Sequence, residues 1–186
     1  MPHFKPGDAV LLLGKYIKLY PGIRGVVLDV KQDPSRPIFN EYTIEFAGGS
    51  KGSVLQFQLV EDASLWPTVA ARVVTDSVRG PVVNNVRGTI HTREIVMQAG
   101  QLDLHIELIE AGQRRALLGQ VLEKNTNRFA DAEIRLIENF IPIQVATANL
   151  LGEFEFPSVL EGSMTLEVLL RASHTRILAE IQIDKF

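Results

Sequence analysis

The chain of 186 residues contains no cysteine. This absence excludes disulfide bonds, thiol nucleophiles and thiolate metal sites together. The four histidines, at positions 3, 91, 105 and 174, are far apart and form none of the spacings HxH, HxxxH or HExxH. A metal site requires three or four ligands in a defined geometry, and no local motif supplies them. We therefore expect no metal ion and no other cofactor, and we expect His105 to be a solvated residue on a strand.

Long apolar runs and an excess of positive charge are also absent. The run AVLLLG at residues 9–14 is far shorter than the roughly 18 residues needed to span a membrane. The N-terminal MPHFKPGD has no apolar signal-peptide core. A net charge of −3, with a pI near 5.8, gives no global positive field for a polyanion. These features predict a soluble cytoplasmic protein without a membrane segment.

Motifs of enzymatic catalysis are missing as well. The stretches GGSKGS and GSM do not match the GxSxG nucleophile elbow, and AGGSKGS lacks the spacing of a P-loop. Ser50 and Lys51 are interpreted as the tip of a hairpin rather than as a Ser–Lys pair. Four carboxylates alternate with apolar residues and predict a solvated outer sheet face: Glu153, Glu155, Glu161 and Glu167. We expect a protein that is not an enzyme.

What the N-terminal part does contain is a series of short strands with turn signals between them. EYTIEF at residues 41–46 alternates apolar and polar residues, as a half-buried strand does. In YPGIRG, Pro21, Gly22 and Gly25 are expected to shape a corner, with Arg24 solvated. Four or five strands within residues 1–62 predict a small barrel. The segments FKPGDAVLLLG, YPGIRGVVLDV, YTIEFAGG and FQLVED resemble an SH3-like barrel of the KOW or translation-protein type, which implies a fold and no ligand.

Residues 91–186 predict seven or eight further strands. In LDLHIELIE, the apolar residues from Leu102 to Leu108 share one face, and Asp103, His105 and Glu107 share the other. Strands at this spacing predict a β-sandwich. The order of motifs resembles the carboxypeptidase-regulatory-like (transthyretin- or CnaB-like) family, in which this module has no catalytic residues of its own. The matching residues are Gly119, Val121, Ala132, Ile134, Leu136, Thr147, Gly152, Phe154, Phe156, Gly162, Leu166 and Val168.

Residues 63–90 are interpreted as a connector between these two domains. The triplet VRG occurs twice in it, at 78–80 and 86–88, and Pro81 and two asparagines favour turns. The segment is slightly basic, whereas residues 96–186 are acidic. Trp66, Arg79 and Arg87 are the candidates for contacts between domains or with a partner.

Two functions remain open at this stage. The first is a non-enzymatic adaptor that binds protein partners, as an accessory subunit of a larger prokaryotic assembly of a regulatory or defence-related kind. The second is RNA or DNA binding through the barrel, for which Lys15, Lys18, Arg24, Lys51 and Tyr20 are the candidate contacts. The neutral charge balance of residues 1–62 disfavours the second function, because phosphate contacts dominate such affinity.

Overall fold

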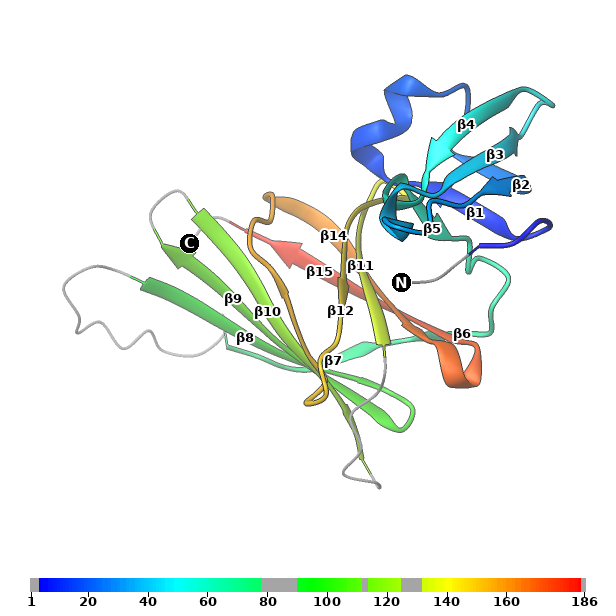
Figure 1. The fold of residues 1–186 in the computed structure, drawn as a ribbon. Coiled ribbons are helices and arrows are strands. Elements are labelled where there is room, and N and C mark those ends of the chain that lie inside the picture. The colour runs from blue at the N-terminus through cyan, green and yellow to red at the C-terminus, as the bar shows by residue number, and fades with distance from the viewer. Residues whose placement is uncertain (1–3, 78–89, 112–113, 125–131, 185–186) are drawn as a thin grey trace. The chain divides into compact units, whose positions relative to one another are not determined.

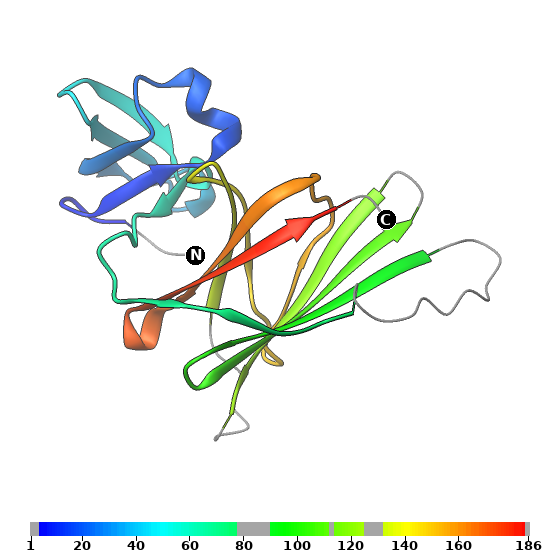
Figure 2. The ribbon, with the colours of Figure 1, turned by 180° about the vertical axis from the view of Figure 1, so that it is seen from behind.

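The structure is a computed structural model that describes residues 4–77, 90–111, 114–124 and 132–184. It is an all-β fold with three five-stranded sheets (Figures 1 and 2). The chain divides into two compact units. The first unit comprises residues 1–65 with 140–143, and the second comprises residues 66–139 with 144–186.

Sheet 1 belongs to the first unit and has the order β4-β3-β2-β1-β5. Its core forms because alternate residues of each strand point inward, as Tyr42, Ile44 and Phe46 do in β3. Three short 3-10 helices interrupt the strands: η1 (Gly14–Leu19), η2 (Pro37–Phe39) and η3 (Gln56–Gln58). The strands are β1 (Ala9–Leu12), β2 (Arg24–Lys31), β3 (Glu41–Phe46), β4 (Lys51–Leu55) and β5 (Leu59–Glu61).

Gly25 has a role that differs from the expected corner. It lies inside β2 and is paired with Val10 of β1 and Phe46 of β3. A Cβ at this position would lie 2.4 Å from Cγ2 of Ile44 and 2.8 Å from the carbonyl oxygen of Glu45. The missing side chain therefore lets β2 and β3 approach each other. The neighbouring turn is shaped without Gly25.

Apart from the first three residues of β12, which count with the first unit, the second unit contains two sheets in a sandwich-like arrangement, seen as separate layers in Figure 1. Sheet 2 has the order β13-β10-β9-β8-β7, and sheet 3 has the order β12-β11-β14-β15-β6. The strands of sheet 2 are β7 (Arg72–Asp76), β8 (Ile90–Ala99), β9 (Leu102–Ala111), β10 (Arg114–Glu123) and β13 (Glu153–Phe156). Those of sheet 3 are β6 (Thr68–Ala70), β11 (Ala132–Glu138), β12 (Ile141–Thr147), β14 (Gly162–Leu170) and β15 (Thr175–Ile183).

The alternation in β9 has the predicted consequence. Leu102, Leu104, Ile106 and Leu108 are all buried, whereas His105 is exposed. The inward rows of the two sheets form the core of the second unit, and they include Ile95, Met97 and Leu117 of sheet 2 and Ile134, Leu136, Leu166 and Val168 of sheet 3. Period-2 patterning thus determines which face of each strand is solvated.

Residues 68–76 belong to the second unit and are part of its sheets. β6 pairs with β15 in parallel, and β7 pairs with β8 in antiparallel orientation. The compact-unit boundary therefore falls after Leu65, and the first part of the expected connector supplies two edge strands. The rest of that segment, with both VRG triplets, lies outside the described residues.

Arg93 links the two sheets of the second unit. Its side chain is 8% exposed and points inward from β8. Nε and Nη2 donate to the two carboxylate oxygens of Asp76 at 2.9 and 2.7 Å. Nη1 donates to the carbonyl oxygen of Gln182, on β15 of sheet 3, at 2.6 Å. The hydrogen bond to Asp76 raises the pKa of the guanidinium, so Arg93 remains charged.

The two-residue turn between β11 and β12 contains an unusual residue, Phe140. Asn139 and Phe140 both have positive φ, 49° and 67°, as the type I′ turn requires. Phe140 is nevertheless 95% exposed, so its ring gains nothing from burial to offset this conformation.

Replacing Phe140 with glycine is expected to stabilise the protein by about 0.5–1 kcal/mol, because Asn-Gly is the preferred pair for this turn. The measurement is urea unfolding of the full chain. Asn139→Gly is the matched control and should change stability less, since asparagine tolerates positive φ. A loss of stability in Phe140→Gly would contradict the prediction.

Candidate functional site

The outer face of sheet 2 contains a hollow of about 700 Å³. Strands β8, β9, β10 and β13 form its floor, and the turn before β13 contributes Asn149. The described lining residues are Glu94, Ile95, Val96, His105, Ile106, Glu107, Leu118, Gly119, Gln120, Asn149, Glu153, Phe154 and Glu155. This lining includes four glutamates and, among the described residues, no lysine or arginine.

Strand register explains how these residues come together. Directly paired residues point to the same side of a sheet. One row across the four strands is Glu94, Glu107, Leu118 and Glu155. The next row is Val96, His105, Gln120 and Glu153. Three strand pairings thus place four carboxylates and one imidazole around a floor that contains Val96 and Leu118.

The lining is dominated by groups that accept hydrogen bonds. Its described members include no serine, threonine, tyrosine or lysine, and the groups in it with nucleophilic atoms are the four carboxylates and the imidazole of His105. Across the described ranges, no three His, Asp or Glu side chains are placed to hold a metal ion. Carboxylates accept hydrogen bonds and attract cations. The hollow is therefore a negatively charged surface with an apolar floor.

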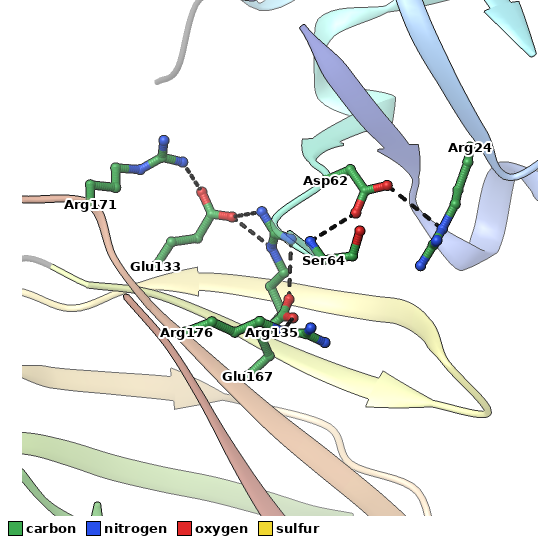
Figure 3. Close-up of polar contacts among 8 residues, drawn as sticks. All are labelled: Arg24, Asp62, Ser64, Glu133, Arg135, Glu167, Arg171 and Arg176. Atoms are coloured by element: carbon green, nitrogen blue, oxygen red, sulfur yellow. Dashed lines mark hydrogen bonds and ion pairs between the residues drawn. The ribbon is translucent and has the colours of Figure 1, made fainter. Parts of the chain in front are cut away.

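A second group of charges lies on the outer face of sheet 3 (Figure 3). Nε of Arg135 donates to Glu133 at 2.7 Å, and Nη1 donates to Glu167, its direct cross-strand partner, at 3.1 Å. Arg171 donates to the second oxygen of Glu133 at 2.6 Å, and Arg176 donates to the second oxygen of Glu167 at 2.5 Å. Each carboxylate therefore lies between two guanidiniums, although Nη2 of the buried Arg135 has an ion pair with Glu133 and no hydrogen-bond partner.

Glu167 differs from the expected solvated residue, because it is only 4% exposed. A signal for this was present in the sequence TLEVLL, where apolar residues occupy both faces of β14. Glu161 forms an ion pair with Arg115 at 3.4 Å. Glu153 and Glu155 are exposed as expected, but they lie in the hollow of sheet 2.

The pairing of Glu94 with Glu107 was not recognised from the sequence. The signal that would have revealed it is the two-residue turn Gly100–Gln101, in which Gly100 has φ of +60°. Such a turn sets the register of the whole β8–β9 hairpin. The placement of Glu153 and Glu155 depends on pairing between β10 and β13, which are far apart in the sequence.

The predicted nucleic-acid contacts of the first unit differ in how far they are exposed and in whether they already contact other residues. Tyr20 is not free for stacking, since its hydroxyl donates to Gln58 at 2.9 Å and its ring lies against Phe46. Arg24 is 60% exposed, and its Nε lies 3.7 Å from a carboxylate oxygen of Asp62 (Figure 3). Lys15 and Lys18 are exposed on η1, and Lys51 is exposed at the start of β4.

The three candidates for domain or partner contacts have different positions. The Trp66 ring lies 5.1 Å from the ring of His174, and both residues belong to the second unit. Arg79 and Arg87 lie outside the described residues. Among the residues that the structure does describe, no helix has the length and apolar character that crossing a membrane requires.

Comparison with protein-family models, with curated proteins and with solved structures finds no match to this chain.

Proposed function

We propose that the chain is a non-enzymatic protein-binding module and an accessory subunit of a larger prokaryotic assembly. In this proposal the first unit is an SH3-like barrel and the second is a transthyretin-like sandwich. Support for the barrel comes from five short strands around one apolar core. Support for the sandwich comes from the pair Gly119–Phe154, two motif residues that lie directly opposite each other on β10 and β13.

The observation that carries the proposal is the negatively charged hollow of sheet 2. Its four carboxylates and its apolar floor together form a surface that is complementary to a basic protein partner.

Affinity purification of the tagged full chain from its native host, at low salt and with or without nuclease, tests this function. We expect protein partners that survive nuclease treatment and are identified by mass spectrometry. A chain that captures no protein under either condition would contradict the proposal.

Nucleic-acid binding by the first unit is a second candidate, favoured by one specific observation. The Tyr16 and Phe39 rings both contact the Phe57 ring, with centroid separations of 5.7 and 6.0 Å. The Lys15 ammonium lies 4.8 Å from the Tyr16 ring, and the Arg36 guanidinium lies 5.1 Å from the Phe39 ring. Proteins bind single-stranded nucleic acid through aromatic rings, on which bases stack, and through adjacent cations.

The double variant Lys15→Glu/Arg36→Glu is expected to weaken binding of a labelled single-stranded oligonucleotide at least about tenfold, because two cations beside the rings become anions. Fluorescence anisotropy at low and physiological salt measures this. The control is Lys5→Glu/Lys31→Glu, which makes the same change of charge at residues with no described cation–π contact. If the unmodified chain has no salt-dependent affinity, this candidate function is discarded.

A further inference from the structure

We infer that the hollow on the outer face of sheet 2 is the docking surface for a partner segment that carries lysine or arginine side chains. This inference rests on the proposed protein-binding function and specifies the chemistry of the partner. It is drawn from a contrast between the two outer faces of the second unit, from the register of the strands and from the apolar floor of the hollow.

The contrast is in the ion pairing of the glutamates on the outer faces of sheets 2 and 3. On sheet 3, Glu133 and Glu167 each contact two arginines. On sheet 2, the glutamates of the hollow form no ion pair with a described lysine or arginine. The paired lysine of this sheet, Lys124, contacts Asp103 outside the lining. The carboxylates of sheet 3 are paired with arginines, whereas those of the hollow in sheet 2 have no described cation beside them.

Register makes these charges costly in the free protein. Glu94 and Glu107 are direct cross-strand partners on adjacent strands. Like charges that face each other in this way destabilise a sheet. A positive charge bound between the two carboxylates would relieve this repulsion.

The apolar floor of the hollow indicates which kind of cation it binds. Half-buried Val96 and Leu118 lie beside the glutamates in the two cross-strand rows. Lysine and arginine place their aliphatic stems on apolar surface while the charged end reaches outward. A hydrated metal ion gains nothing from such a floor, and the described side chains offer no metal geometry. Phosphate groups would be repelled. A basic protein segment satisfies both the charge and the apolar floor.

The test uses the full chain and a fluorescein-labelled peptide of alternating lysine and serine, with a glutamate–serine peptide as the opposite-charge control. Fluorescence anisotropy should detect binding of the basic peptide only, weakening as salt increases. In Glu94→Gln/Glu107→Gln the affinity should fall about tenfold, which corresponds to ~1.4 kcal/mol. The matched control Glu45→Gln/Glu180→Gln removes the same charge from β3 and β15 and should bind as the unmodified chain does.

Several results would overturn the inference. The first two are a basic peptide that does not bind and an equal loss of affinity in the two double variants. The third is calcium that displaces the peptide by binding at Glu94 and Glu107. The fourth is a dimer of the unmodified chain that Glu94→Gln/Glu107→Gln abolishes. A thermal melt shows that the variant folds, because removing the like-charge pair should raise its Tm. If Glu94→Gln/Glu107→Gln captures the same proteins from lysate as the unmodified chain, the docking surface is refuted but the proposed function is not. If the unmodified chain captures no protein, the proposed function itself is refuted.

Discussion

Replacement of Arg93 by leucine is expected to lower the free energy of unfolding by about 3 kcal/mol. Leucine has no charge to pair with Asp76, whose side chain is only 19% exposed. The carbonyl oxygen of Gln182 loses its 2.6 Å hydrogen bond at the same time. Because these contacts join β7 and β8 to β15 of the other sheet, the loss should reduce the cooperative stability of the second unit. Urea unfolding followed by circular dichroism measures the change.

Arg72 provides the matched control for this substitution. It is an exposed arginine on the adjacent strand β7, so Arg72→Leu should change stability by no more than about 0.5 kcal/mol. In the double variant Arg93→Leu/Asp76→Leu, part of the lost stability should return, since the carboxylate that Arg93 contacts is removed together with the guanidinium. Equal effects of Arg93→Leu and Arg72→Leu would show that the linkage between the sheets contributes nothing.

Gly119→Ala is expected to destabilise the protein by about 3 kcal/mol. Gly119 lies opposite Phe154, and a Cβ would be 2.1 Å from Cζ of its ring. The ring is buried, with 5% exposure, and is packed against Gly119. Accommodating one methyl group therefore requires displacement of the ring or of strand β13. Thermal unfolding of the full chain measures the loss.

A double-mutant cycle with Phe154→Leu separates this cause from glycine's conformational freedom. The smaller side chain should relieve the contact, so that Gly119→Ala costs much less in the Phe154→Leu background than in the unmodified chain. Additive effects of the two substitutions would indicate that the ring is not what makes glycine necessary at position 119.

The fold class and the solvated faces of strands were predictable from the sequence because they are local properties. The alternation of Leu104, His105, Ile106 and Glu107 determines the burial of β9 whatever its neighbours are. The acidic character of the C-terminal half was also evident. The sequence was less informative for β6 and β7. Their residues are mostly exposed, and these strands are defined by pairing with β15 and β8.

The sequence by itself therefore determined the type of secondary structure, the inward rows and the residues available for binding. Tertiary structure alone decided which of those residues meet. Gly25 and Gly119 acquire their roles from Ile44 and Phe154, across strand pairs. Glu167 is buried between Arg135 and Arg176, whereas Glu155 lies in the hollow of sheet 2, where the described lining contains no arginine. The physical reason is that cross-strand register joins residues far apart in the chain, and no local pattern specifies that register.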